Sequence, residues 1–217
     1  FKAIDYCDHF VIYDDVQYDK HSWRNRNRIK TPTGPIWLTV PVLTRGKSGQ
    51  LVSETLIDNR SHWGEKHLKA LQANYARAPF FKEYYPVLGS VLSTPQERLA
   101  DLDAALIQKI AGLLNLKTEI IRSSQLNIQG DKINRLISLC RHFGAGVFYE
   151  GKAGEDYIEP REFGKNGIRV EFQNYQHPVY RQLHGEFVSH LSIADLLFNH
   201  GPESLKILIG EAAVSNP

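Results

Sequence analysis

The sequence has no methionine, only two cysteines and no long apolar run, and each of these features excludes a class of protein. Cys7 and Cys140 are too few for a disulfide framework, and neither they nor the nine histidines show a zinc-binding spacing. We therefore predict no metal site and two buried free thiols, which suit a reducing cytoplasm. No apolar run is long enough to cross a bilayer, so no membrane span is expected.

An excess of charge of one sign is also missing. The formal net charge is +2, with basic and acidic residues interspersed, so the chain lacks the long-range field that grips duplex DNA. Any anion site must be local. The chain begins at Phe1 rather than at a methionine, so we expect that the natural start is not included. The absence of a signal peptide is then weak evidence about where the protein is located.

What is present is the composition of a globular protein, with 42% hydrophobic and 23% charged residues over 217 positions. This length predicts one domain, residues 1–217, with a helical insertion at about 61–115. In that insertion Thr94-Pro-Gln-Glu97 has the composition of a helix N-terminus with a capping box. A strand-like run over Pro35 to Val42 precedes the insertion. Ser192-Ile-Ala-Asp195 resembles a capping box, with Asp195 as its acid, and predicts a later helix start.

The pattern from Thr118 alternates between strand and helix, which is typical of a parallel sheet with crossover helices. We predict an α/β fold in which strands containing Val11, Thr118, Val147 and Ile168 share one mainly parallel sheet. Such sheets open their ligand crevice at the carboxyl ends of the strands. Polar residues that follow these strands are therefore the candidates for a site.

Asp14 and Asp15 stand at the exit of the first strand, with Gln17 and Tyr18 close behind. Adjacent carboxylates can bind a hard cation, or one can act as a base while the other orients a substrate hydroxyl. A solvated strand end or a helix cap explains the pair equally well.

The most unusual segment is Trp23-Arg-Asn-Arg-Asn-Arg28, where three guanidinium groups alternate with two amides beside an indole ring. In an extended conformation the arginines point one way, and Asn25 and Asn27 point the other. The arginine face could hold phosphate in a bidentate manner, and the same composition could stack on single-stranded RNA. A solvated basic edge strand is the alternative.

A second polar cluster follows the later strands, in the segment Glu150-Gly-Lys-Ala-Gly-Glu-Asp-Tyr157. Its glycines could leave room for an anion, or could serve only a tight strand-to-helix turn. We predict that the turn from Gly151 to Tyr157 lines one concave polar pocket together with Asp15, Arg24, Asn25 and Arg26. Lys132 and Arg135 lie off the apolar face of the helix that Lys132 begins. No Walker or dinucleotide-binding fingerprint occurs, and we predict no cofactor.

Several short motifs, in this order, resemble the WbqC-like family over almost the whole chain. They are Tyr13-Asp-Asp-Val-Gln-Tyr18, Trp23-Arg-Asn-Arg-Asn27, Ala78-Pro-Phe-Phe81, Gly144-Ala145, Asp156-Tyr-Ile158 and Asp195-Leu-Leu-Phe-Asn199-His-Gly201. The family is bacterial and is associated with gene clusters for O-antigen and other surface polysaccharides. Its members usually begin with a strand and a polar turn before the equivalent of Phe1, a segment that this sequence does not include.

The resemblance implies a cytoplasmic role in lipopolysaccharide biosynthesis, with a transferase that adds an acyl or aminoacyl group to a nucleotide-linked amino sugar as the leading hypothesis. The implied catalytic residues are Asp14 and Asp15. The implied substrate-binding residues are Gln17, Tyr18, Trp23, Arg24, Asn25, Arg26, Asn27, Lys132, Arg135, Asp156 and Tyr157. A noncatalytic protein that binds nucleotide sugars or glycans, and an RNA-binding module, are the alternatives; DNA is not an expected partner, and the oligomeric state stays open.

Overall fold

The computed structural model describes residues 1–20 and 22–211, and its contacts cluster into two compact units. We call Phe1–Tyr13 together with Lys117–Gln176 the sheet unit, and Asp14–Leu116 together with His177–Pro217 the helical unit. The chain therefore passes from the sheet unit into the helical unit after Tyr13, returns at Lys117 and leaves again after Gln176. The single domain with a helical insertion at about 61–115 stays a prediction.

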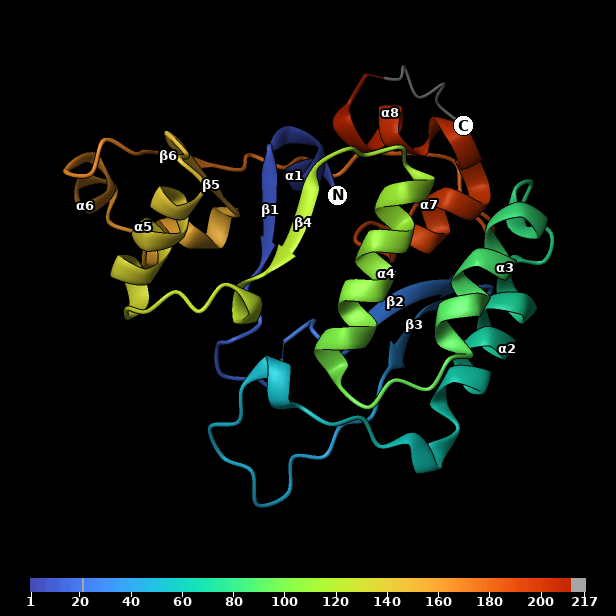
Figure 1. Ribbon diagram of the computed structural model, residues 1–217. Helices are drawn as coiled ribbons and strands as arrows, with labels where there is room; N and C mark the ends of the chain where they lie inside the picture. Colours follow the sequence, from blue (N-terminus) through green and yellow to red (C-terminus); the bar gives the residue numbers. More distant parts are fainter. Residues whose placement is uncertain (21, 212–217) are drawn as a thin grey trace. The chain divides into compact units, whose positions relative to one another are not determined.

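The sheet unit contains four short strands that pair two by two in parallel (Figure 1). Strand β1 (His9–Ile12) pairs with β4 (Glu119–Arg122), and β5 (Val147–Glu150) pairs with β6 (Arg169–Phe172). Its helices are α1 (Lys2–Tyr6), α5 (Lys132–His142) and α6 (Pro160–Gly164), with 3-10 turns at Ser123–Gln125 and Lys152–Asp156.

The parallel pairing and the crossover helices are as the sequence predicts, but the prediction of one shared sheet is wrong. Among the described residues, β1–β4 and β5–β6 form two separate sheets. Each sheet has only one ladder of hydrogen bonds, so one edge of β1 and one edge of β5 have no strand beside them. A cluster of buried apolar side chains holds α5 and α6 against β5 and β6; its buried members are Ile137, Cys140, Ile158, Phe163 and Ile168.

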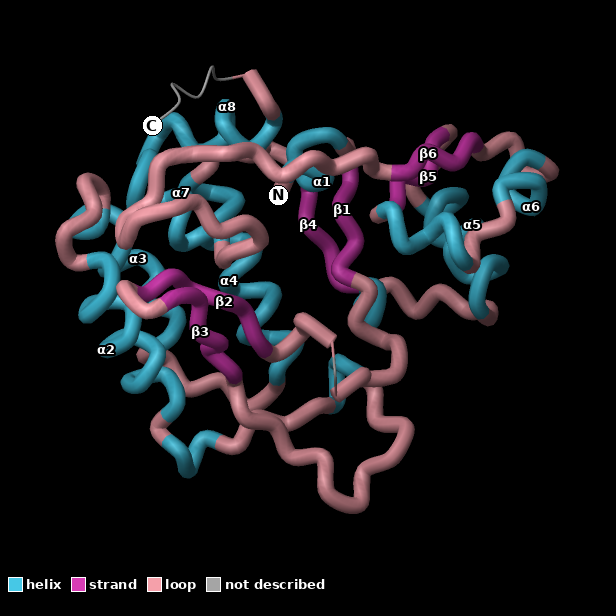
Figure 2. The backbone as a smooth tube through the Cα atoms, turned by 180° about the vertical axis from the view of Figure 1, so that it is seen from behind, coloured by secondary structure: helices cyan, strands magenta, loops and turns pink. Residues whose placement is uncertain are grey.

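The helical unit consists of an antiparallel hairpin and a group of helices. The hairpin is β2 (Arg26–Thr31) and β3 (Gly34–Thr39), and β3 lies within the predicted run except that it starts at Gly34. The helices are α2 (Trp63–Tyr75), α3 (Phe81–Leu92), α4 (Leu99–Leu113), α7 (Ile193–His200) and α8 (Ser204–Ile209), with 3-10 turns at Val52–Glu54, Asn59–Ser61 and Gly201–Glu203. The view from behind shows the hairpin in front of α2 and α3, so these helices lie on one side of it (Figure 2).

The predicted helix start at Thr94 is wrong, because α4 begins at Leu99 with no side-chain cap. The residues before it pair with an extended segment instead: the Ile57 N–H donates to the carbonyl of Glu97, and the Leu99 N–H donates to the carbonyl of Thr55. These backbone bonds compete with the capping box and hold residues 97–98 in an extended conformation. The Ser192 cap is confirmed, since its hydroxyl accepts from the Ala194 N–H.

A buried polar group joins β2 to α2 and α7. The hydroxyl of Tyr75 accepts from the Lys30 backbone N–H and donates to Asp195 Oδ2, at 2.8 Å in both cases. Lys30 Nζ donates to the carbonyls of Gly185 and Glu186. Asp195 is therefore an interior residue, fully buried, rather than the acid of a capping box.

The cysteines differ from each other. Cys140 is a buried free thiol, as predicted, and burial raises its pKa to about 11. Cys7 is a free thiol but is only half-buried, so the prediction that both are buried is wrong for Cys7. In the part of the chain that the structure describes, no helix is long and apolar enough to cross a membrane.

Candidate functional site

Asp14 and Asp15 follow Tyr13, the first residue after β1, so the strand has ended before them. Asp14 is only 1% exposed, and its carbonyl oxygen accepts from the Ser53 N–H at 2.8 Å. Asp15 is half-buried and lies in a bend. Of the two carboxylates proposed as catalytic, Asp15 is therefore the one that solvent reaches more easily.

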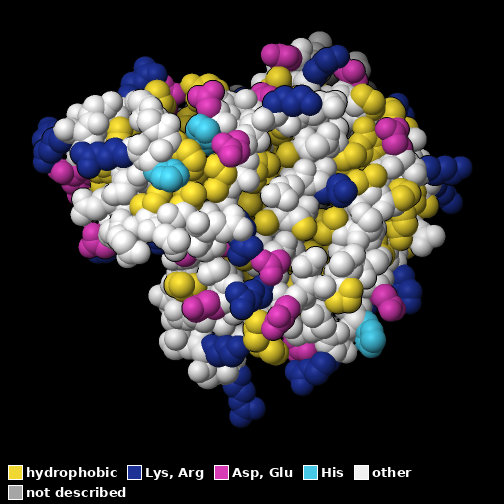
Figure 3. All heavy atoms as spheres, viewed as in Figure 1, with side chains coloured by type: hydrophobic (Ala, Val, Ile, Leu, Met, Phe, Trp, Pro, Cys, Tyr) yellow, Lys and Arg dark blue, Asp and Glu magenta, His cyan; other side chains and the backbone are white. Residues whose placement is uncertain are grey.

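Gln17 and Tyr18 line a cavity of about 680 Å³ that we call the loop pocket. Its other walls come from Asp19, Lys20 and the segment 44–50, in which Gly46 and Gly49 take positive φ angles of 72° and 77°. Lys20 and Lys47 provide positive charge, and basic and acidic side chains mix at the bottom of the view in Figure 3, where this segment lies. Tyr18 itself belongs to a hydrophobic core cluster, so its ring is not free to stack on a ligand.

The most exposed aromatic surface of the helical unit is formed by Trp23, Trp37, Arg26 and Arg28, which we call the Trp–Arg surface. Trp23 is 53% exposed and Trp37 is 42% exposed, with ring centroids 4.7 Å apart. The guanidinium of Arg26 lies 4.6 Å from the Trp37 ring, and that of Arg28 lies 5.6 Å and 5.7 Å from the Trp23 and Trp37 rings. These distances lie within the range of cation–π attraction, which holds both guanidinium groups beside the exposed pair of indole rings.

The alternation predicted for the arginines is present only from Arg26 onward. Arg28 also donates through Nη2 to the carbonyls of Ser189 and His190, at 3.1 and 3.2 Å. Arg24 lies before the strand, in a turn, and its Nη1 donates to the carbonyl of Gln17 at 3.0 Å. Arg24 therefore contacts the backbone of a residue that lines the loop pocket.

The two asparagines have unequal surroundings. Asn25 is buried, and its side-chain Nδ2 donates to the backbone carbonyl of Val40 at 2.9 Å. The backbone carbonyl of Asn25 accepts from the Val40 N–H at 2.8 Å. These two bonds fix the start of the hairpin. Asn27 is exposed, and its Oδ1 accepts from the Arg28 N–H.

Asp103 on α4 is an acidic residue that the sequence reasoning missed. Burial raises its pKa to about 7, and the positive charge of Arg24 opposes this rise. Tyr18 also experiences the charges of Asp103 and Arg24, which places Asp103 near this part of the site. One signal was available: Asp103 follows Leu99 by four residues and precedes Ile110 by seven, so it sits on the apolar stripe of α4.

The second predicted cluster lies in the sheet unit. The guanidinium of Arg135 is 5.4 Å from the ring of Tyr13, and Lys132 starts α5 with a positive φ of 40°. Asp156 ends the 3-10 turn after β5 and is exposed. Tyr157 is 58% exposed, and its pKa is raised by partial burial and by the charges of Glu150 and Tyr13.

The glycines of that turn have different roles. A Cβ on Gly154 would lie 2.5 Å from Glu150 Cγ and 3.1 Å from Phe172 Cε1, so close packing requires glycine there. A Cβ on Gly151 would meet nothing within 4 Å. Because Asp15 and the arginines belong to the helical unit, a pocket shared with this turn stays a prediction. Within residues 1–20 and 22–211, no group of three or more His, Cys, Asp or Glu side chains could hold a metal ion.

Comparison with known proteins supports the resemblance seen in the motifs. The model of the WbqC-like protein family matches residues 1–207. An uncharacterized protein of Mycobacterium tuberculosis, Rv1507c, is 38% identical over 206 residues, which cover 94% of this chain and 89% of that protein. No solved structure shows a significant match. The chain therefore belongs to the WbqC-like protein family.

Proposed function

We propose that the protein binds a nucleotide-linked amino sugar at the Trp–Arg surface and loop pocket, and transfers an acyl or aminoacyl group to it in surface-polysaccharide biosynthesis. The observation that carries the proposal is the exposed pair Trp23 and Trp37 held beside Arg26 and Arg28. A nucleotide offers what this surface complements, a flat ring to stack on an indole and phosphates to pair with guanidinium groups. The cytoplasmic location that such a substrate implies is part of the same proposal.

The loop pocket is suited to the phosphates or the sugar. Lys20 and Lys47 offer ammonium donors, and the turns at Gly46 and Gly49 bring backbone close to the cavity. Arg24, which follows Trp23 in the chain, donates to the backbone carbonyl of Gln17 at this pocket. These positively charged side chains can bind an anion locally. Such a site does not require an excess of positive charge over the whole protein, which agrees with the net charge of +2.

The proposed reaction is attack of the sugar amine on an activated acyl carbon. The new C–N bond forms, the bond from the acyl carbon to its leaving group breaks, and the amine loses a proton to a carboxylate. Asp15 is the predicted base. Asp103, whose pKa of about 7 suits a group that exchanges protons at neutral pH, is the alternative base.

Affinity for nucleotide sugars tests the binding step. Arg26→Ala should weaken binding by roughly 1.5–3 kcal/mol, the usual range for a hydrogen bond to a charged group, and leave the fold intact. Arg77→Ala, at an exposed arginine of the same unit beyond the end of α2, is the matched control. Isothermal titration against a panel of nucleotide sugars measures both variants. Equal affinities for Arg26→Ala and the unaltered protein would reject the Trp–Arg surface as the binding site.

Product formation tests the chemical step. Asp15→Asn should preserve binding and abolish turnover if Asp15 is the base. If Asp103 is the base, the rate should rise as the pH increases through about 7, and Asp103→Asn should remove that rise. Turnover that survives both substitutions would contradict a carboxylate base at this site.

A noncatalytic role in nucleotide-sugar or glycan binding is the second candidate function. The burial of Asp14 favours it, since one of the two predicted catalytic acids is closed off from solvent. This role predicts the same loss of affinity in Arg26→Ala, without product formation by the unaltered protein.

A further inference from the structure

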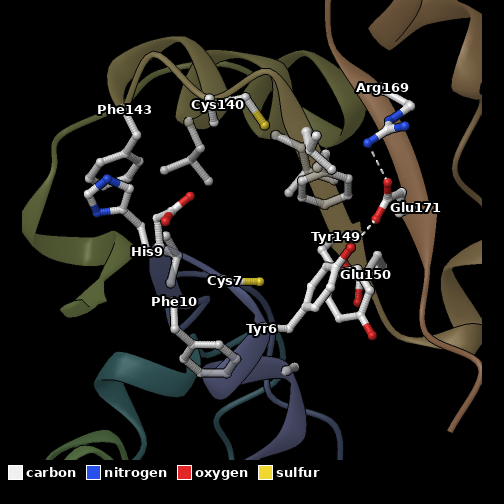
Figure 4. A pocket seen from close by; sticks show the side chains of 18 of the residues that line it. Tyr6, Cys7, His9, Phe10, Cys140, Phe143, Tyr149, Glu150, Arg169 and Glu171 are labelled. Carbon is white, nitrogen blue, oxygen red and sulfur yellow. Dashed lines mark hydrogen bonds and ion pairs between the residues drawn. The ribbon is translucent and has the colours of Figure 1, made fainter. Parts of the chain in front are cut away.

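Two histidines, His9 and His190, differ in the charges around their rings. In the sheet unit, His9 stacks on Phe143 with ring centroids 4.6 Å apart (Figure 4). The Nδ1 of His9 lies 3.0 Å from Glu119 Oε2, which neutralises a proton on that ring. In the helical unit, His190 is exposed, and its Nδ1 lies 2.9 Å from Ser189 Oγ. No carboxylate of the described residues pairs with His190, so a positive charge on its ring is not neutralised from within the protein.

His190 belongs to the segment 185–192, which we call the strap and which is attached to β2 through its own backbone. Lys30 Nζ donates to two carbonyls at the start of the strap. Arg28 Nη2 donates to two more, those of Ser189 and His190. A bond of 2.8 Å from the last N–H of the strap to the Arg28 carbonyl completes the attachment. All these bonds use backbone groups of the strap, so the imidazole of His190 is not needed to hold the strap in place.

The bonds to the strap limit what Arg28 can offer to a phosphate. A guanidinium has five N–H donors, and a bidentate pair uses donors on two of its nitrogens. In Arg28 the two hydrogens of Nη2 are directed at two strap carbonyls, and Nε is buried with no hydrogen-bond partner among the described residues. Arg28 therefore keeps only Nη1 for a ligand. An anion held there gains from a second donor close by.

His190 can supply that donor when its ring is protonated. Its own carbonyl lies 3.2 Å from Arg28 Nη2, so the residue is next to this guanidinium. Histidine side chains titrate between about pH 5 and pH 8, and the imidazolium has two N–H donors. In that form Nδ1 can donate to Ser189 Oγ while Nε2 donates to an anion. A bound anion favours the protonated ring, so binding of the anion takes up a proton.

His177 supports the ring of His190 without competing for the proton. The two ring centroids are 5.0 Å apart. The Nδ1 of His177 lies 2.8 Å from the Pro178 carbonyl, which can only accept, so Nδ1 carries a hydrogen. Burial lowers the pKa of His177, and a charge on His190 lowers it further. The rings of Tyr180 and Phe187, at 6.1 and 5.7 Å, hold His177 in place, and it stays neutral when His190 is charged.

We propose that protonated His190 is an anion-binding residue of the Trp–Arg surface and that it forms, with Arg28, a subsite for one phosphate group. The proposal rests on the proposed function, in which the phosphates of a nucleotide-linked sugar bind at that surface. His177 is a positioning residue that acts through His190. The charged and titratable groups that face this pair of imidazoles are Arg28, beside His190, and Tyr180, beside His177. Neither is a carboxylate, so protonation of His190 adds positive charge where the phosphate binds.

Isothermal titration with UDP-glucose at about pH 5.5 and about pH 8 tests the proposal. UDP-glucose is the probe because neither its diphosphate nor its sugar titrates in this range. The unaltered protein should bind roughly tenfold more tightly at the lower pH, since only the protonated ring donates to the phosphate. Titrations at about pH 6.5 in buffers of different ionisation enthalpy should detect the uptake of a proton on binding.

Two substitutions of His190 separate its charge from its place in the strap. His190→Asn should lose both the gain in affinity at the lower pH and the uptake of a proton. His190→Lys, which is charged at both pH values, should bind about as tightly at the higher pH as at the lower. His62→Asn is the matched control, because His62 is also exposed in the helical unit and its φ of 50° is close to the 57° of His190. Asparagine tolerates such angles, and this control should keep the pH dependence.

The role of His177 is tested by the same titrations. His177→Ala should weaken the pH dependence, and His177→Phe, which keeps a neutral ring beside His190, should restore it. Equal results for these two variants would reject the positioning role.

Two results would overturn the subsite, and they differ in what they say of the proposed function. UDP-glucose may bind with an affinity that Arg26→Ala weakens but that does not depend on pH, or whose pH dependence His190→Asn retains. Either outcome removes His190 from the site and leaves the nucleotide-binding surface in place. No binding of UDP-glucose at either pH would reject the surface as a nucleotide site, and the subsite with it.

Discussion

Asp103 is the alternative base of the proposed reaction, and its raised pKa also lowers the free energy of unfolding as the pH rises. Its pKa in the folded protein is about 7, against an ordinary value of 3.8, because burial disfavours the charged carboxylate. Between these values the folded state keeps a proton that the unfolded state has released, so the free energy of unfolding falls as the pH rises from about 4 to about 7. Above that range both states are ionised, and this effect no longer changes.

Asp103→Asn should therefore reduce the loss of stability between pH 4 and pH 7. Urea denaturation at several pH values measures it, and the same substitution at Asp101, two residues earlier on α4, is the control. If Asp103→Asn loses as much stability as the unaltered protein over this range, the carboxyl is not held in a desolvated position.

Gly201 is required at the end of α7 for two reasons. Its φ of 49° and ψ of −122° are unfavourable for residues with a side chain, and an added Cβ would lie 2.4 Å from Phe80 Cδ1. Gly201→Ala should destabilise the protein clearly more than Gly144→Ala, a control with a φ of 62° and nothing within 4 Å of the added Cβ. Thermal unfolding compares the two variants, and equal losses would mean that Phe80 moves aside at little cost.

The hydroxyl of Tyr75 joins β2 to α7 within the buried polar group. Tyr75→Phe removes the acceptor of the buried Lys30 N–H and a donor to Asp195 at the same time. A buried polar group that loses its partner costs about 1–3 kcal/mol, so we expect a loss of at least this order. Tyr85→Phe, which removes a half-buried hydroxyl with a 3.3 Å bond to the Leu68 carbonyl, is the matched control in a urea titration. A loss no greater than that of the control would contradict a structural role for this group.

Elements with a clear apolar period could be predicted from the sequence, whereas their ends and polar contacts could not. The strand at His9 and the helix from Lys132 form nearly as predicted, because local pattern and burial agree there. The start of α4 could not be predicted, since the bonds from residues 97–99 to Thr55 and Ile57 come from a distant segment. Asp195 was assigned to a helix cap for the same reason: its partner Tyr75 is 120 residues away.

In the candidate site too, local sequence patterns could be predicted and contacts between distant segments could not. The unusual run from Trp23 to Arg28 could be identified from composition, but Trp37 could not, because only the hairpin register brings it against Arg28. The parallel pairs of the sheet unit were predictable from the alternation of strands and helices. The separation of the two strand pairs into two sheets could not be predicted, because it depends on which strand edges have another strand beside them.

At the scale of the whole molecule, the low net charge predicts weak salt dependence of ligand binding. Affinity for a nucleotide sugar should change only a few-fold between 50 and 200 mM salt, since few charges are paired. A single-stranded RNA held through five phosphates would lose roughly a hundredfold over the same range. Titrations at the two salt concentrations separate these functions, and a steep slope with an RNA oligonucleotide would favour the RNA-binding alternative.

The pairing of β1 with β4 joins His9 to Glu119, residues 110 positions apart, with most of the helical unit between them. During synthesis at about 5–20 residues per second, β1 leaves the ribosome roughly 5–20 s before its partner exists. The segment 14–116 has that interval in which to fold first, while the edges of β1 stay open to wrong partners. Because β4 comes so late in the chain, the sheet unit folds after the segment 14–116. Its folding is therefore the step at which chaperones or misfolding would act.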